Sequence, residues 1–127
     1  MMQRIDHLVL VGLGGVAGAT LRWLVGETIA VDSFPWHTLL VNVVGCALLA
    51  AVTTRSLPLG RNRLIAAGFC GGLTTFSTFS IEVVELLDSN ENATALLYLV
   101  ASIALGLIAY VGVRRKTLAP PNLDEAA

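Results

Sequence analysis

In the stretch GFCGGLTTFSTFS, residues 68–80, two adjacent glycines are followed by hydroxyl side chains and two phenylalanines. It lies within an apolar segment, residues 64–87, that is long enough to cross a bilayer as a helix. Polar and aromatic residues partly alternate after Leu73, as in a strand, but a single strand cannot cross lipid because its backbone groups have no partners there. We therefore predict a helix that is interrupted. We place the interruption at Gly71 and Gly72, because glycine has little helix propensity and nearby hydroxyls can satisfy freed backbone groups.

The whole chain has the composition of a membrane protein. Of its 127 residues, 55% are hydrophobic and 13% are charged, whereas soluble domains carry about 25% charged residues. Further apolar segments at about 8–31, 36–54 and 93–113 predict one all-α integral membrane domain of four spans, followed by a flexible tail, 114–127. Short linkers make neighbouring spans antiparallel. The net charge of −1 argues against a nucleic-acid partner.

Basic residues gather at one end of the predicted bundle. Four spans place both termini and the second loop on one side, which holds Arg4, Arg55, Arg61, Arg63, Arg114, Arg115 and Lys116. The first and third loops contain no Lys or Arg, and carry Asp32, Asp88 and Glu91 instead. By the positive-inside rule, we predict that both termini are cytoplasmic and that the protein lies in the bacterial plasma (inner) membrane.

Several polar side chains fall inside the spans. Thr38, Asn42 and Cys46 recur every four residues and share one helix face. An asparagine in mid-membrane needs a partner, either across a helix interface or in a wet pathway. Arg22 either extends to the nearer interface or contributes to an electropositive vestibule that attracts anions. Glu82, one turn beyond Phe79, is a second candidate for a water-filled vestibule.

Two further patterns concern packing and aromatic rings. Phe76 and Phe79 are three residues apart and lie on roughly one helix face. Their rings either pack or present their positive edges to a small anion. In the fourth span Tyr98, Ser102 and Gly106 repeat every four residues, as a line of hydroxyls or a tight contact. In the first span Gly14 and Gly18 form a G-x-x-x-G pattern, which favours close helix approach.

The chain resembles the fluoride channel family called Fluc, or CrcB. The residues that resemble it are GFCGGLTTFSTF at 68–79, GGVAGATLR at 14–22 and TLLVNVVG at 38–45. The resemblance implies a fluoride-selective channel, not an enzyme, that lowers cytoplasmic fluoride toxicity by passive efflux. It also implies a dimer of two oppositely oriented subunits that enclose two pores.

Roles for individual residues follow from the resemblance alone. Phe76 and Phe79 supply ring edges along the fluoride path, and Asn42 lies nearby. Carbonyls of Gly71 and Thr74, given by both subunits, hold a structural sodium ion (Na+). The resemblance also assigns hydroxyls to the path and matches one arginine to the vestibule: Thr75, Ser77, Thr78, Tyr98, Ser102 and Arg22.

Two departures from the family pattern stand out. His37 occupies a position where the family usually has glycine. Seven basic residues lie on one predicted side of the membrane and none in the loops on the other, which does not suit a subunit that inserts in both orientations. We therefore predict that this chain pairs with an oppositely oriented homologous subunit rather than with a second copy of itself. Two rival functions remain: a proton-coupled exporter of the small multidrug-resistance type, which needs a carboxylate in the middle of its first span, and a non-conducting assembly subunit.

Overall fold

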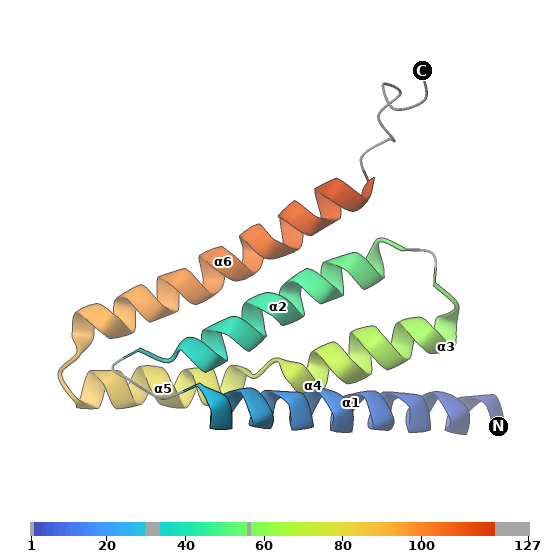
Figure 1. The fold of residues 1–127 in the computed structure, drawn as a ribbon, viewed down its shortest axis with the longest axis horizontal. Helices are drawn as coiled ribbons and strands as arrows, with labels where there is room; N and C mark the ends of the chain where they lie inside the picture. The colour runs from blue at the N-terminus through green and yellow to red at the C-terminus, as the bar shows by residue number, and fades with distance from the viewer. Residues whose placement is uncertain (1, 30–33, 56, 119–127) are drawn as a thin grey trace, which may run out of the picture.

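The chain folds into four long helical segments joined by short loops (Figure 1). The computed structural model describes residues 2–29, 34–55 and 57–118. The elements are α1 (Met2–Thr28), α2 (Trp36–Thr53), α3 (Leu59–Asn62), the π-helix η1 (Arg63–Cys70), α4 (Gly71–Leu73), α5 (Phe76–Asp88) and α6 (Asn92–Leu118). The third span comprises α3 through α5, and all four spans are long and apolar enough to cross a membrane. The predicted all-α membrane fold is confirmed.

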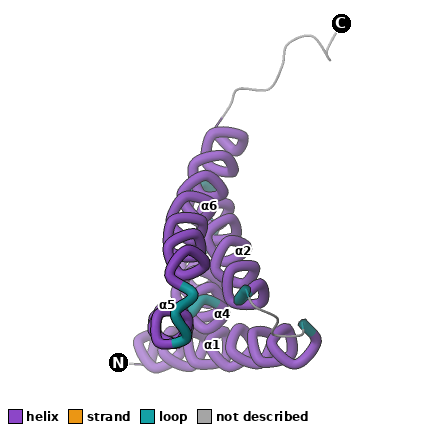
Figure 2. The backbone as a smooth tube through the Cα atoms, turned by 90° about the vertical axis from the view of Figure 1, so that its left-hand side faces the viewer, coloured by secondary structure: helices purple, strands orange, loops and turns teal. Residues whose placement is uncertain are grey.

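The four spans run antiparallel, with both termini at one end (Figure 1). α1 packs along η1 and α4, while α2 lies between the third span and α6. In the perpendicular view, α1 forms one edge of the assembly and α6 rises away at the other (Figure 2). The third span is therefore covered by neighbours on two sides, and its interruption lies between α1 and α2.

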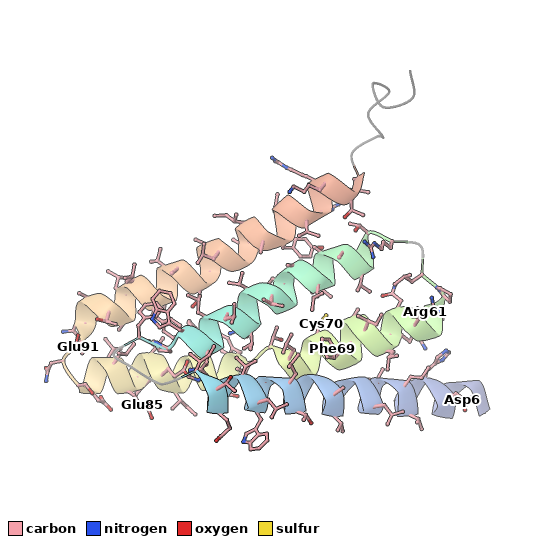
Figure 3. All side chains as sticks on the ribbon, viewed as in Figure 1. Asp6, Arg61, Phe69, Cys70, Glu85 and Glu91 are labelled. Carbon is pink, nitrogen blue, oxygen red and sulfur yellow. The ribbon has the colours of Figure 1, made fainter. Side chains whose placement is uncertain are left out.

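The charged side chains labelled in Figure 3 lie at the two ends of the molecule, whereas Arg22 and Glu82 bind partners inside it. Asp6 and Arg61 mark the end that holds the termini, Glu85 and Glu91 mark the opposite end, and Phe69 lies in between. Large apolar side chains are widely exposed along α1 and α6. This distribution suits a surrounding of lipid, in which exposed apolar residues have no cost.

Two predicted boundaries differ from the structure. α1 ends at Thr28, and residues 30 and 31 of the predicted span lie outside the described residues. The tail was predicted to begin at 114, but α6 continues to Leu118, so residues 114–118 are helical; residues 119–127 lie outside the described part. Arg115 and Lys116 occupy the last turn of α6, where positive charge stabilises the negative end of the helix dipole.

The third span is broken, as predicted, but not at the glycines. Gly71 is helical, with φ −64° and ψ −36°. The chain instead becomes extended at Thr74 (φ −80°, ψ 154°) and Thr75 (φ −146°, ψ 120°). Placing the interruption at Gly71 and Gly72 was therefore wrong, because helix propensity is a weak preference that tertiary packing overrides.

The glycines serve close packing of two helix backbones. A methyl group added to Gly72 would collide with the carbonyl group of Gly15, and one added to Gly18 would collide with the carbonyl group of Phe69. Gly14 is equally close to the backbone of η1. The close approach predicted from the G-x-x-x-G pattern is confirmed, and it joins α1 to the third span.

Candidate functional site

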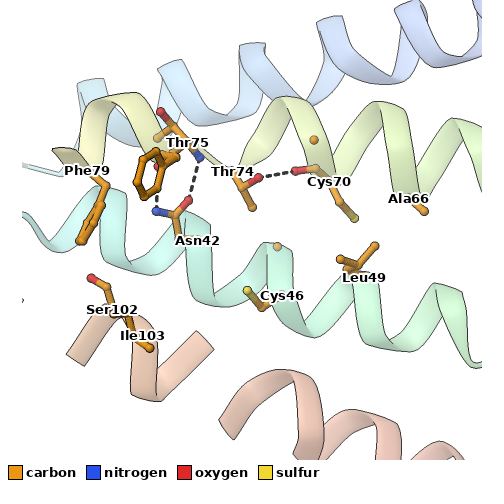
Figure 4. Close-up of a pocket in the computed structure, with 13 residues that line it drawn as sticks. Asn42, Cys46, Leu49, Ala66, Cys70, Thr74, Thr75, Phe79, Ser102 and Ile103 are labelled. Atoms are coloured by element: carbon orange, nitrogen blue, oxygen red, sulfur yellow. Dashed lines mark hydrogen bonds between the residues drawn. The ribbon is translucent and has the colours of Figure 1, made fainter. Parts of the chain in front are cut away.

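Asn42 of α2 holds both backbone groups of Thr75 at the break. Its Nδ2 donates to the Thr75 carbonyl oxygen at 3.1 Å, and its Oδ1 accepts from the Thr75 N–H at 2.8 Å (Figure 4). The side-chain amide replaces the partners that a residue loses where a helix stops. Two alternatives were predicted for Asn42, and the structure shows the first, in which its partner lies across a helix interface. Asn42 also lines the pocket described below.

Arg22 of α1 reaches the break from the other side. Its Nη1 donates to the Thr74 carbonyl oxygen at 3.0 Å. The guanidinium group therefore binds the interior of the fold instead of extending to the interface. It places positive charge beside the carbonyl end of α4, where the helix dipole is negative.

Hydroxyl groups start the second half of the broken span. Thr75 is the N-cap of α5, and its Oγ1 accepts from the Thr78 N–H at 3.1 Å. The same oxygen lies 2.9 Å from the Thr78 hydroxyl and 3.3 Å from that of Ser77. The structure thus brings these three predicted hydroxyls together, and they fix where α5 begins.

The two phenylalanines of α5 lie side by side in different surroundings. Their ring centroids are 5.9 Å apart. Phe76 is 81% exposed, whereas Phe79 is 9% exposed and packs on the ring of Tyr98 with a centroid distance of 5.2 Å. Phe76 therefore lies open on the outer face of the chain.

A pocket of about 430 Å³ lies between α2, the third span and α6. Figure 4 shows Asn42, Thr75 and Phe79 at one end of it and Leu49 and Ala66 at the other. Its thirteen lining residues are Asn42, Gly45, Cys46, Leu49, Ala66, Cys70, Gly71, Thr74, Thr75, Phe76, Phe79, Ser102 and Ile103. None of these carries a charged side chain, so the pocket offers only hydroxyl, amide, thiol, aromatic and aliphatic groups.

The predicted polar positions of α6 face α2 and the pocket. Ser102 lines the pocket, and its buried Oγ has no hydrogen-bond partner among the described residues. Gly106 lies against Cys46, since a methyl group there would be 3.4 Å from its Sγ. Along this face of α6, Ser102 therefore offers a hydroxyl without a partner among the described residues, and Gly106, one turn later, makes a tight contact with α2.

Glu82 is enclosed by donors rather than by water. Thr38 donates to its Oε1 at 2.7 Å, and the Tyr98 hydroxyl donates to its Oε2 at 2.6 Å. His37 Nε2 lies 3.2 Å from Oε1, and the Glu82 side chain is 12% exposed. Glu82 therefore lies in a hydrogen-bonded cluster next to Phe79, not in the open.

The predicted cation ligands have the right chemistry for a hard ion. In a continuous helix the Gly71 carbonyl would accept a hydrogen bond from the Thr75 N–H. Here the Thr75 N–H donates to Asn42 Oδ1 instead. The Thr74 carbonyl accepts from Arg22, but a carbonyl oxygen has a second lone pair. Hard cations bind such backbone oxygens. A methyl group at Gly71 would meet nothing within 4 Å, so this face of the helix is open.

A four-span membrane protein with one span broken in its middle, beside a pocket without charged side chains, has the architecture of an ion-channel subunit. A sequence profile described as "CrcB-like protein, Camphor Resistance (CrcB)" matches residues 9–113. The chain belongs to this family.

Curated relatives are similar along most of their length. The chain is 46% identical to "Fluoride-specific ion channel FluC 2" of Rhodococcus jostii over 109 residues, which is 84% of this chain and 96% of the relative. It is 40% identical to "Fluoride-specific ion channel FluC" of Prosthecochloris aestuarii over 121 residues, 89% of this chain and 94% of that one. The FluC of Oceanobacillus iheyensis is 41% identical over 118 residues, 85% of this chain and 89% of that one.

Sequence reasoning missed the partners of the buried polar groups. It did not predict that Arg22 and Asn42 both bind the break, nor that His37 contacts Glu82. The spacing of Asn42 behind Thr38 showed which face of α2 is polar, and a buried carboxylate requires donors. Neither signal identifies which residue of another span supplies the partner.

Proposed function

We propose that this chain is the subunit of a fluoride-selective channel that gives passive efflux of fluoride and protects the cell from it. Support comes from the names of its relatives and from one structural feature: α5 begins in mid-membrane at Phe76, with Phe79 and the Thr75 hydroxyl on the pocket. The first N–H groups of a helix lack helical partners, and its N-terminus favours anions.

The pocket lining suits rapid passage of a strongly hydrated anion. A selective pore must replace the hydration shell and still release the ion. The hydroxyl of Ser102, which has no hydrogen-bond partner among the described residues, and the edges of Phe76 and Phe79 offer weak positive poles. Because no lining residue is charged, no fixed cation traps the ion. In this mechanism Ser77, Thr78 and Tyr98 hold the neighbouring groups in place, and no chemical step occurs.

The rival exporter function is not supported by the first span. Such a transporter requires a carboxylate in the middle of α1 to exchange protons. The acidic residues of α1 are Asp6 and Glu27, and both lie near its ends and are exposed. The carboxylate inside the bundle, Glu82, belongs to α5 and already accepts hydrogen bonds from Thr38 and Tyr98.

The working unit in this proposal is an inverted dimer. Gly71 is exposed and the ring of Phe76 is 81% exposed, and in this proposal the second subunit covers both. Two copies of Gly71 and Thr74 would hold a structural sodium ion at the dimer axis, where it would neutralise four converging carbonyl dipoles. Removing sodium should then dissociate or loosen the dimer, which analytical ultracentrifugation in detergent with sodium or with N-methylglucamine would measure.

The charge bias favours a dimer of two different subunits. With both termini in the cytoplasm of a bacterial cell, the seven basic residues fix the orientation of this chain. A partner of the same fold with the opposite loop charges would complete the pore. A fluoride-conducting homodimer, formed when this chain is expressed alone, would disprove this part of the proposal.

Fluoride efflux from liposomes tests the function. Vesicles containing the protein, with its partner where required, are loaded with potassium fluoride, and efflux is followed with a fluoride electrode without a proton gradient. We expect chloride-loaded vesicles to show no comparable efflux. A complete lack of fluoride efflux from well-folded protein, alone and with the partner, would refute the channel function.

Exchange of the phenylalanines tests the site. Phe76→Ile and Phe79→Ile should abolish flux because an aliphatic side chain has no positive edge. Phe76 is mostly exposed in the subunit, and the Phe79 exchange should cost about 1 to 2 kcal/mol of packing. Phe34→Ile is the matched control, since Phe34 also packs on Tyr98, at 5.4 Å, but does not line the pocket.

A further inference from the structure

His37 makes the one contact between a basic and an acidic side chain found among the described residues, its Nε2 lying 3.2 Å from Glu82 Oε1. It stands at the second position of α2 and is 17% exposed. Its Nδ1 is buried and has no hydrogen-bond partner in the described part of the chain. The imidazole is therefore held by Glu82 alone, with one nitrogen left free.

The contact lies two side chains away from the pocket. Glu82 Oε2 accepts from the Tyr98 hydroxyl at 2.6 Å, and the Tyr98 ring packs on that of Phe79. Phe79 lines the pocket. A change of charge on His37 therefore acts on a carboxylate that is linked to the pocket wall through Tyr98, and the low exposure of both side chains, 17% and 12%, reduces screening by solvent.

Few other charges compete with this pair. On α1, Glu27 is exposed, and Arg22 is bound to the carbonyl of Thr74. On α5, Glu85 is exposed. On α2 and α6 the groups that face Glu82 are the neutral hydroxyls of Thr38 and Tyr98; Asp32, in the first loop, lies outside the described residues.

We propose that His37 is a positioning residue that couples anion flux to pH through Glu82, an inference that rests on the proposed channel function. With a neutral imidazole, Glu82 leaves a net negative charge beside the pathway, which repels fluoride. With an imidazolium, the two groups form an ion pair of zero net charge, and the repulsion ends. Flux therefore increases as the pH falls through the range in which histidine changes charge, between about pH 8 and 5.

The direction has a physiological consequence. Acid surroundings convert fluoride to its neutral acid, which crosses lipid, so the demand for efflux is greatest at low pH. A histidine at the end of the bundle opposite the termini (Figure 1) raises flux under those conditions. A chain with glycine at position 37 would have a fluoride path whose flux does not depend on the charge of a histidine.

The test is the pH profile of fluoride efflux, with the same pH on both sides of the vesicle and the leak of protein-free vesicles subtracted. Between about pH 8 and 5.5 we expect wild-type flux to rise roughly three- to tenfold, the size of effect expected of one unit charge in surroundings of effective dielectric constant about 20, reduced by salt. His37→Gln should stay at the low level at every pH. His37→Lys, charged throughout this range, should stay at the high level.

The chain offers a matched control. His7, on α1 at the opposite end of the molecule, is the one other histidine, and His7→Gln should keep the wild-type profile. A His37→Gln profile that rises as the wild type does would overturn the inference, as would a flat wild-type profile. If His37→Gln does not fold, a His37→Lys profile that parallels the wild type has the same meaning. Absence of wild-type flux at every pH would instead overturn the channel function.

Discussion

Replacing Asn42 by alanine removes both partners of Thr75 at once. The N–H and the carbonyl oxygen of Thr75 are hydrogen-bonded to Asn42 at 2.8 and 3.1 Å, and both would lose this partner inside the membrane. An unsatisfied buried group costs about 1–3 kcal/mol, so the two together give a loss of about 2–6 kcal/mol. The variant can avoid part of this cost if the Thr75 N–H returns to the Gly71 carbonyl, which closes the break and moves Phe76 and Phe79 out of register. Either way, we expect Asn42→Ala to abolish fluoride flux.

Two measurements separate this role from a direct contact with fluoride. Thermal unfolding in detergent reports the loss of stability, and hydrogen exchange of a peptide covering residues 68–80 reports protection of the Thr75 amide. Asn92→Ala, at an exposed position where α6 begins, is the control and should change neither. An Asn42→Ala protein without flux, but with wild-type stability and an unchanged Thr75 amide, would refute the clamp and show that Asn42 acts on the ion itself.

Two further predictions concern the packing around the break. Gly72→Ala should destabilise the fold by about 1–3 kcal/mol, because its methyl group collides with the Gly15 carbonyl; Gly12→Ala, with nothing within 4 Å, should be neutral in the same thermal unfolding assay. Tyr98→Phe removes the 2.6 Å hydrogen bond to Glu82 and should cost about 1.5–3 kcal/mol, the usual range for a bond to a charged group. A Tyr98→Phe protein of wild-type melting temperature would show that Glu82 is satisfied without it.

Composition and periodicity were sufficient to predict the four spans, because length and hydrophobicity alone decide whether a helix can cross a bilayer. They also predicted an interrupted third span. The polar faces of α2 and α6 followed from spacing, since residues four apart share a face. These features depend on residues that are near one another in the sequence.

The position of the break could not be obtained in this way. Gly71 and Gly72 are the residues with the lowest local propensity for helix, yet both remain helical, and α1 packs directly on the backbone at Gly72. The break falls at Thr74 and Thr75, where Arg22 and Asn42 from two other spans bind the backbone groups that lack helical partners. A contact between residues 33 or 52 positions apart leaves no trace in local pattern.

A break in a membrane helix exposes both poles of the backbone, and only one of them suits an anion. The carbonyl end of α4 would repel fluoride, and here the Thr74 and Thr75 carbonyls are occupied by Arg22 and Asn42. The amide end, where α5 starts at Phe76, faces the pocket lined by rings and hydroxyls. Asn42, predicted beside the fluoride path, and Arg22, predicted in a vestibule or at the interface, thus both bind the carbonyl pole of the break. In the proposed mechanism, they leave an N-terminus of modest positive potential, which would attract an anion without binding it tightly enough to stop its passage.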